Sequence, residues 1–433
     1  MAKSLSGSFL KQLEKEIMKN LTGSRKSMTP ARPSSFLWFI CIAYLTQGIA
    51  QHFCLIAQPL DYYMLKALGS NAAEVASLLS VLMIPWMIKP VYGIVSDFLP
   101  LAGYRRKSYL ILAYSLGGCF YLVSALASSF SALIFALFLT ATGMAIGTTI
   151  ICGLTLEVGR PGAQTRTFQS IQAVCYYSAS IISFLIGGAL CANLVPSVAL
   201  HCAAAIAAVP CFVTAGSAWW LLRENKSTRT KIDLVALKNV FYQLRARKLL
   251  VVALFLCCWS FSPGFGTPLY FHETKTLGFT QLFIGQLGAI NSVGMIVGAL
   301  IFSKCMDRKL GTKTQATISV LIGTVSTFGY LLLASESSAI LLEFFRGVAN
   351  VIAVLTIYGL AADVSPKRME STSIALLIAA YNIAEQISNV LGANLYSYVF
   401  KDGFAELIVV SALATLACML LVPVLPDKDQ YAS

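Results

Sequence analysis

Residues 85–107 read PWMIKPVYGIVSDFLPLAGYRRK, and this stretch decides how the rest of the chain is interpreted. Its first part is apolar and is interrupted by one cation, Lys89. It then runs through Gly-x-x-x-Asp at 93–97 and a short turn into Arg-Arg-Lys at 105–107. An apolar segment that stops at an acid and is followed by three cations is typical of a membrane helix that leaves the bilayer on its cytoplasmic side.

The composition of the whole chain agrees with a bilayer environment. Of the 433 residues, 57% are hydrophobic and 12% are charged, and the mean hydropathy is +0.74. Soluble proteins carry about 25% charged residues, so this composition excludes most of them. The formal net charge of +13 is compatible with a nucleic-acid partner until its location along the chain is known.

Apolar runs long enough to cross a bilayer, which takes about 20 residues, recur along the chain. Twelve can be drawn, at 36–58, 75–95, 109–128, 132–154, 170–191, 197–222, 249–270, 281–302, 316–333, 339–361, 373–396 and 405–424. We therefore predict an all-α membrane protein with twelve transmembrane helices in two six-helix pseudo-repeat bundles. The expected divisions are a basic cytoplasmic extension (1–35), an N-terminal bundle (36–222), a cytoplasmic linker (223–248), a C-terminal bundle (249–425) and a cytoplasmic tail (426–433).

The distribution of cations tests this topology. With both termini in the cytoplasm, 27 of the 32 Lys and Arg residues fall in inside segments and three, Lys66, Lys275 and Lys401, fall outside. Inside loops of membrane proteins carry the excess of Lys and Arg, so the split supports the span count and the orientation. It also leaves no case for nucleic acid. The two remaining cations, Lys89 and Arg346, lie within spans.

No constellation for catalysis or metal binding is present in the sequence. The twelve cysteines show no CxxC or Cys/His metal spacing, the three histidines are scattered, and there is no Gly-Lys-Ser/Thr phosphate loop. We therefore expect no enzyme activity, no metal and no cofactor, and ATP is not the direct energy source.

The two halves repeat the same sequence pattern at corresponding span ends, with an acidic residue followed by clustered cations. Acids and clustered cations there are suited to ion pairs that form in one conformation and break in another, although ordinary positive-inside loops are the alternative. The expected cytoplasmic gate residues are Gly93, Asp97, Arg105, Arg106, Glu157, Asp307, Arg308 and Asp363.

This six-plus-six repeat resembles the major facilitator superfamily, whose halves enclose a site at the middle of the membrane. Residues 85–97 and 103–110 further resemble the signature of the folate-biopterin transporter family, with support from Gln47-Gly48, from 263–270 and from 370–377. One departure is Ser303, which stands where the repeat would place a glycine. The resemblance implies a transporter, with folate or a pterin as substrate.

Charged side chains inside a bilayer cost about 2.5 to 3.5 kcal/mol each and generally face a partner or a water-filled cavity. Lys89 is a candidate to attract a substrate carboxylate, or it neutralises a nearby acid. Glu343, Arg346 and Asn350 share one helix face. There, a structural Glu-Arg pair competes with a role in holding a proton.

The span at 373–396 carries a second polar stripe, of which Asn382, Glu385 and Gln386 are candidate site residues. Glu385 has no cation in its own helix, and burial without a partner favours the protonated form of a carboxyl group. It is the preferred proton-coupling residue, with Glu343 and Asp61 as further candidates. A salt bridge from Glu385 to Lys89 or Arg346 is the alternative.

The first span of each half completes the candidate site. Gln47, Gln51 and Gln58 form a stripe that either lines a wet cavity or joins helices, because an amide in hydrocarbon needs a hydrogen bond. In the seventh span, the prolines and glycines predict a broken helix that serves as a gate hinge or contacts substrate. These hinge residues are Pro263, Gly264, Gly266 and Pro268.

Taken together, the sequence predicts a secondary active transporter of folate- or pterin-like organic anions that works by alternating access with protons as coupling ion. We expect a multi-pass symporter in a plasma (inner) membrane that acts as a monomer, with the lipid bilayer as its other partner. The alternatives are a transporter of another small organic anion, such as a nucleoside derivative or a peptidoglycan fragment, and a non-transporting receptor on the same fold.

Overall fold

The structure is a computed structural model, and it describes residues 33–51, 54–159, 165–224, 247–306, 309–364 and 370–426. The extension at 1–32, most of the linker and the last seven residues, for which we predicted cytoplasmic positions, lie outside the described residues, as do Asp307, Arg308 and the side chain of Asp97.

The described residues are almost entirely helical. In the N-terminal half the helices are α2 (Pro33–Ala50), α3 (Ala57–Lys66), α4 (Ala72–Met87), α5 (Lys89–Phe98), α6 (Lys107–Ala125), α7 (Phe130–Gly159), α8 (Thr165–Asn193) and α9 (Pro196–Leu221). In the C-terminal half they are α11 (Arg247–Ser260), α12 (Gly266–Phe271), η2 (His272–Thr276), α13 (Gln281–Ile301), η3 (Phe302–Met306), α14 (Thr312–Gly329), η4 (Tyr330–Leu332), α15 (Glu336–Val364), α16 (Glu370–Asn394), η5 (Leu395–Val399), α17 (Phe404–Ala417) and η6 (Cys418–Val424).

Each predicted span corresponds to one helix or to consecutive helical segments. Nine helices among the described residues are long and apolar enough to cross a membrane, and Ser35–Ala50 and Lys248–Ser260 are shorter apolar helices. The first span differs from expectation, because it consists of two helices and is interrupted between Ala50 and Ala57. The second span is interrupted at Ile88, as expected from Pro90, which has no amide hydrogen to continue the helical bonding.

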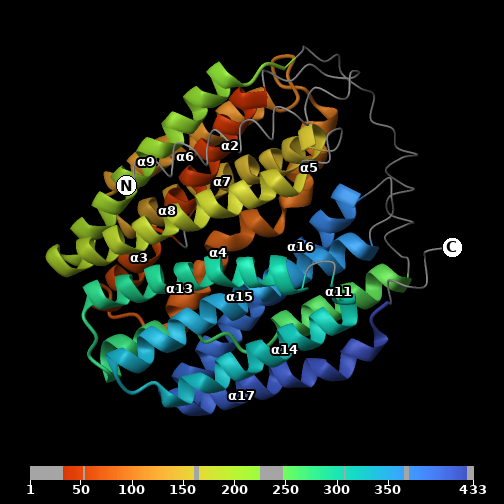
Figure 1. The fold of residues 1–433 in the computed structure, drawn as a ribbon. Helices are drawn as coiled ribbons and strands as arrows, with labels where there is room; N and C mark the ends of the chain where they lie inside the picture. Colours follow the sequence, from red (N-terminus) through yellow and green to blue (C-terminus); the bar gives the residue numbers. More distant parts are fainter. Residues whose placement is uncertain are drawn as a thin grey trace, which may run out of the picture.

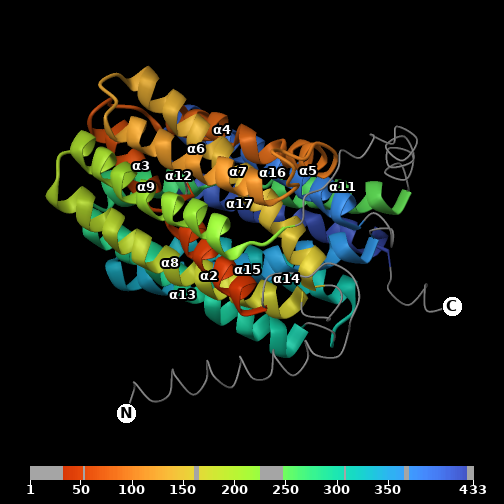
Figure 2. The ribbon, with the colours of Figure 1, turned by 90° about the horizontal axis from the view of Figure 1, so that it is seen from above.

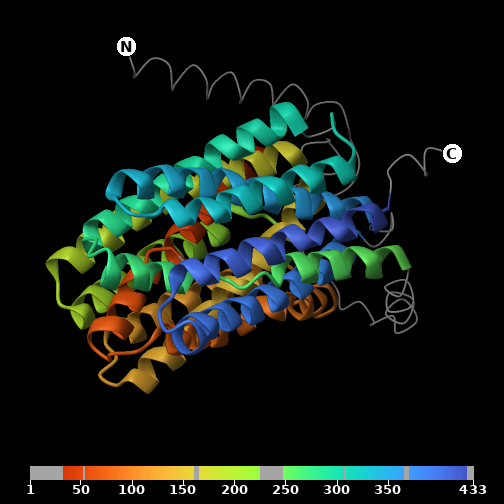
Figure 3. The same cartoon turned by 90° about the horizontal axis from the view of Figure 1, so that it is seen from below.

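The two halves lie against each other as two layers. In Figure 1 the helices of the N-terminal half, coloured red through yellow to the yellow-green of α9, form the upper layer, and the green-to-blue helices from α11 onward form the lower one. The most extensive contacts between the halves are those of α8 with α13 and of α4 with α16, and smaller ones join α5 with α16 and α4 with α12 and η5. Figure 2 shows α8 beside α13 from above. The view from below, in Figure 3, has the green and blue helices in front.

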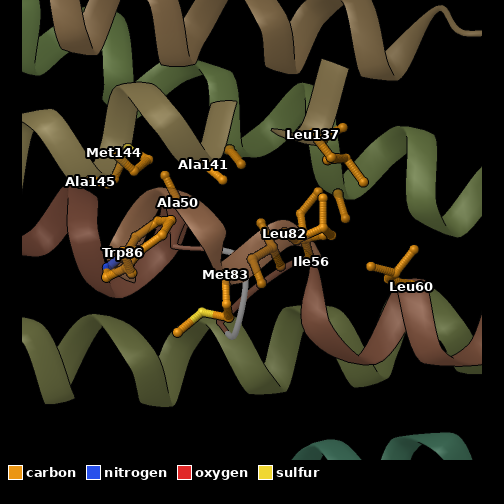
Figure 4. Close-up of a cluster of buried hydrophobic side chains, with 14 of the residues drawn as sticks. Ala50, Ile56, Leu60, Leu82, Met83, Trp86, Leu137, Ala141, Met144 and Ala145 are labelled. Carbon is orange, nitrogen blue, oxygen red and sulfur yellow. The ribbon is translucent and has the colours of Figure 1, made fainter. Parts of the chain in front are cut away.

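The apolar core is not shared evenly along this contact. The largest buried cluster includes residues of both halves, such as Leu60, Leu82, Leu269 and Tyr396. Figure 4 shows the part of it formed where α3, α4 and α7 meet. A second cluster, around Val252 and Leu360, belongs to the C-terminal half alone. The largest cluster therefore joins the two halves, and a small third cluster around Val351 also has Tyr177 of the N-terminal half packed against it.

Candidate functional site

Polar and aromatic side chains from both halves are linked by pairwise interactions, and we call this group the central site. It consists of Tyr44 (α2), Lys89 (α5), Cys152 (α7), Tyr358 (α15), Tyr381 and Glu385 (both α16). The Tyr44 hydroxyl lies 3.9 Å from the Cys152 sulfur. Lys89 and Tyr358 both interact electrostatically with Cys152. Because Tyr358 belongs to the opposite half, it faces the space between the halves.

The side chains of the central site remain accessible although they lie within spans. Cys152 is exposed, Tyr358 is 48% exposed, and Tyr44, Lys89, Tyr381 and Glu385 are half-buried. Tyr381 interacts electrostatically with both Glu385 and Tyr358. The central site therefore offers aromatic faces, one ammonium group and one carboxyl group to a molecule that enters between the halves.

The helix break at Ile88 positions Lys89. Because α4 ends at Met87 and α5 begins at Lys89, the lysine occupies the first turn of a new helix. Its Nζ lies 5.8 Å from the ring centre of Trp86, within the range of a cation–π contact. No described carboxylate lies within ion-pair distance of it. Among the described cations within spans, Lys89 is therefore the one available to an incoming anion.

Arg346, the other predicted substrate-binding cation, is held by an acid. Its Nη2 and Nε donate to Glu343 Oε2 at 2.8 and 3.1 Å. The Tyr330 hydroxyl donates to the other oxygen of Glu343 at 2.5 Å, and Asn291 Nδ2 donates to Oε2 at 3.0 Å. Glu343 is fully engaged and 2% exposed, which is the arrangement of a structural ion pair. Arg346 itself keeps 31% of its side chain accessible.

The glutamine stripe of the first span joins helices in this conformation. Gln47 donates to the Tyr114 hydroxyl on α6, Gln51 donates to Gln47, and the Tyr176 hydroxyl on α8 donates to Gln51. Both glutamines are buried. Of the two readings that the sequence left open, the contacts support helix joining for Gln47 and Gln51, not a wet surface.

The other predicted polar residues are spread over different surroundings. Asn350 is exposed, Asn382 is half-buried and Gln386 is buried. Glu385 forms no ion pair with Lys89 or Arg346 within the part of the chain that is described, which removes the expected alternative of an inter-helix salt bridge in this conformation. Asp61 is remote from the central site, on α3.

At one end of the bundle the two halves are tied together, and we call this the closed end. Gln58 Nε2 donates to the backbone oxygen of Gln281 at 2.6 Å and to its Oε1 at 3.1 Å. Asn71 donates to the Tyr398 hydroxyl at 3.2 Å. Every hydrogen bond between halves that involves only described residues is at this end. Gln58, a predicted substrate-binding residue, bridges the halves in this conformation.

The opposite end, which carries the Arg105–Lys107 turn, is called the loop end. Arg106 Nη2 contacts Glu157 Oε1 at 2.5 Å and its Nη1 donates to Ser96 at 2.7 Å, so the predicted pairing of this turn with the acid of the fourth span is confirmed. Asp363, its counterpart, accepts from Thr312 at 2.8 Å. Ser96 Oγ donates to Gly93 O at 2.9 Å, and a Cβ added to Gly93 would lie 3.8 Å from Thr149 Cγ2.

Glu224, which the sequence did not single out, anchors the loop end. Its carboxylate accepts from the backbone amides of Arg105, Arg106 and Lys107 at 2.8 to 3.2 Å. These amides precede and begin α6, where free N–H groups and the helix dipole favour an anion. The start of the linker is thereby fixed to the N-terminal half.

The predicted break in the seventh span is confirmed between α11 and α12. Its free backbone groups are bonded by the neighbouring helices, since Gly264 N donates to Ser388 O at 3.0 Å and Ser411 Oγ donates to Pro263 O at 2.6 Å. A Cβ on Gly392 would lie 1.9 Å from Gly264 O. The break is thus packed against α16 and α17. Gly266 has open space and Pro268 is buried.

Comparison with models of known protein families identifies the family of this chain. The profile of the BT1 family matches residues 47–432. The chain belongs to the BT1 family. As a member it is a transporter, not an enzyme, and an integral multi-pass membrane protein.

Relatives of this BT1 family member carry transporter names. It is 27% identical to the folate-biopterin transporter of Synechocystis sp., over 92% of this chain and 83% of the relative. It is 24% identical to folate transporter 1 of Plasmodium falciparum, over 83% and 74%.

Among solved structures, the fold is similar to that of major facilitator superfamily transporters. A D-xylose-proton symporter has a TM-score of 0.69 at 13% identity, with 91% of this chain and 98% of that chain covered. A peptide transporter of the POT type has a TM-score of 0.70 at 13% identity, covering 90% and 94%. The predicted all-α membrane fold of the major facilitator type is confirmed, while nine of the described helices are long and apolar enough to cross a membrane.

Proposed function

We propose that this chain is a secondary active transporter that carries a folate- or pterin-like organic anion by alternating access, with protons as the coupling ion. The observation that carries the proposal is the central site, in which an ammonium group without a carboxylate partner stands among tyrosines contributed by both halves. A ligand of this class has a flat heterocycle for the aromatic faces and carboxylates for Lys89.

Alternating access is supported by where the halves touch. Hydrogen bonds between described residues of the two halves are confined to the closed end, and the apolar cluster shared by both halves includes residues that flank it, such as Tyr270 and Phe283. More of the Lys and Arg residues, among them Arg105, Arg106 and Lys107, belong to segments at the loop end than at the closed end. By the positive-inside rule, the loop end is therefore the cytoplasmic end. On this assignment the conformation is inward-facing, and the termini are cytoplasmic in a plasma membrane protein.

Proton coupling is supported by Glu385. Its carboxyl group is half-buried in the central site, next to Tyr381 and without an ion pair to a described cation. Such a group changes its protonation when the site is hydrated or filled. Because both halves of the site come from one chain, a monomer suffices for the cycle.

A second candidate substrate is a smaller aromatic carboxylate. The central site requires only a ring and an anionic group, and a benzoate transport protein of Acinetobacter baylyi is 26% identical over 39% of this chain. A nucleoside derivative or a peptidoglycan fragment would place different demands on Lys89, because the anion is then a phosphate or lies far from a ring.

The test is uptake into proteoliposomes that contain the purified full chain. Radiolabelled folate, a pterin without carboxylates, benzoate and a nucleoside are compared with and without an imposed pH gradient. We expect folate or pterin to accumulate only with the gradient, and Glu385→Gln to abolish the response to the gradient. Accumulation that is equal with and without the gradient would refute proton coupling, and uptake of none of the four would refute the substrate class.

A further inference from the structure

The closed end contains a buried carboxyl group that the central site does not use. Asp61 lies on α3, one turn after Gln58, which bridges to Gln281. Asp61 Oδ1 is buried and accepts no hydrogen bond from a described residue, and the same holds for Gln58 Oε1. Residues three apart lie on one helix face. Two acceptors on this face are therefore left without a donor.

The groups around Asp61 carry no compensating positive charge. Cys191 on α8 and Tyr270 on α12 interact electrostatically with it. The helix α9 also packs against α3, and its titratable groups near this end are His201 and Cys202. The ion pairs of the described residues do not include one between His201 and Asp61. The two described groups that interact electrostatically with Asp61, a thiol and a phenol, thus carry no positive charge.

An ionised carboxylate with a buried oxygen that lacks a donor is energetically costly, because the protein does not replace the hydrogen bonds of water. A proton on Asp61 removes this cost because it makes the group neutral. It also provides an O–H donor on the face where Gln58 Oε1 lacks one. Opening the closed end has the opposite effect, since water would then solvate the carboxylate.

We propose that Asp61 is a proton-binding site that latches the closed end, so that the two halves close there only when this carboxyl group carries a proton. When that end opens, the group is hydrated and ionises, and the end stays open until a proton arrives from the same side. This deepens the proposed proton coupling and rests on it for its role in transport. It assigns a proton to the interface between halves, apart from Glu385 in the central site.

The native thiol of Cys191 reports on this latch. Cys191 is 2% exposed in the closed conformation, and it lies on the helix that faces Asp61. The full chain in lipid nanodiscs, without substrate, is treated with a neutral maleimide at pH 6 and pH 8.5, and the labelled peptides are quantified by mass spectrometry. The reference in the same sample is Cys211, which is buried within the N-terminal half and away from the interface.

One linked proton changes the ratio of open to closed molecules by up to about tenfold per pH unit. We expect the Cys191 to Cys211 labelling ratio of the wild type to rise about tenfold from pH 6 to pH 8.5. Asp61→Asn should keep the low ratio at both pH values. Loss of the neighbouring negative charge would by itself favour the reactive thiolate of Cys191, so this chemical effect cannot produce the expected protection.

The matched control is Glu336→Gln, which removes an exposed carboxyl group at the first residue of α15 and should behave as wild type. Equal labelling of Asp61→Asn and wild type at pH 8.5 would overturn the latch. If Asp61→Asn does not fold, the wild type alone tests the proposal. A Cys191 to Cys211 labelling ratio that is the same at pH 6 and pH 8.5 would also overturn the latch. If the labelling results are as expected but uptake into proteoliposomes does not depend on a pH gradient, the proton-coupling proposal is refuted and the latch is retained.

Discussion

Gln58 of α3 and Gln281 of α13 are joined across the two halves by a side-chain amide that bonds a backbone oxygen at 2.6 Å and a side-chain oxygen at 3.1 Å. The Gln281 Oε1 also accepts from the Tyr270 hydroxyl at 3.1 Å. The two glutamines stand 223 positions apart in the chain. Whatever opens the closed end must therefore break this contact.

Gln58→Ala should shift the bundle toward opening at the closed end. A neutral hydrogen bond contributes about 0.5 to 1.5 kcal/mol net, which corresponds to roughly a 2- to 10-fold rise in maleimide labelling of the buried Cys54 and Cys191. Gln315→Ala is the control, because Gln315 bonds two carbonyls within its own half. Unchanged labelling in Gln58→Ala would mean that the contact does not hold the end.

Lys89→Ala should weaken folate binding roughly 10- to 100-fold, the loss expected for a charge-assisted contact of about 1.5 to 3 kcal/mol. A pterin that lacks carboxylates should bind the variant and the wild type nearly equally, and Lys89→Arg should retain part of the folate affinity. Calorimetric titration of the purified chain measures all of these. Equal losses for both ligands would show that Lys89 supports the fold of the site and does not pair with a carboxylate.

Arg106→Ala and Glu157→Gln should each lower thermal stability, because Arg106 is 7% exposed and bridges Glu157 and Ser96. Removing one partner of a mostly buried pair leaves the other unsatisfied, at a cost of about 1 to 3 kcal/mol. In the double variant the losses should be less than additive. Strict additivity in thermal unfolding would argue against the pair.

Glu224→Ala should lower stability by about 0.5 to 2 kcal/mol, the range for loss of a helix cap. Glu224→Gln keeps one acceptor oxygen but removes the charge at the start of α6, so its loss should be intermediate. Thermal unfolding in detergent ranks the three proteins. A wild-type melting temperature for Glu224→Ala would contradict the anchoring role.

Gly392→Ala should prevent folding or accumulation of the chain, because its Cβ would lie 1.9 Å from a backbone oxygen that cannot move away easily. Gly266→Ala is matched to it. Gly266 is also at the break of the seventh span, but nothing lies within 4 Å of its added Cβ. Size-exclusion profiles of the two variants should therefore differ sharply, and a monodisperse Gly392→Ala would contradict the packing of α12 against α16.

The sequence predicted features that depend on strong, local signals. Apolar runs gave the spans, Pro263 to Pro268 gave the break, and an acid facing three cations gave the contact between Arg106 and Glu157. Each follows from the cost of placing charge or free backbone groups in hydrocarbon.

The residues that were missed carry no such signal. Tyr358 and Tyr381 are tyrosines inside apolar runs, and only the tertiary arrangement shows that Tyr358 interacts with Cys152 of the other half and Tyr381 with Tyr358 and Glu385. Glu224 stands in a polar segment where an acid is unremarkable until its three amide contacts are known. Periodicity placed Gln47, Gln51 and Gln58 on one stripe, but it could not tell the buried inter-helix network from the bridge between halves.

The apolar cluster that runs through both halves also makes the carrier kinetically asymmetric. Separating the halves there exposes buried apolar surface at a cost of about 25 cal/mol per Å², so the empty protein favours the conformation seen here. A ligand that arrives at the loop end meets a competent site at once. A ligand at the closed end binds only to the minor population of molecules that are open at that end. Its apparent affinity from that side equals its intrinsic affinity multiplied by the fraction of such molecules.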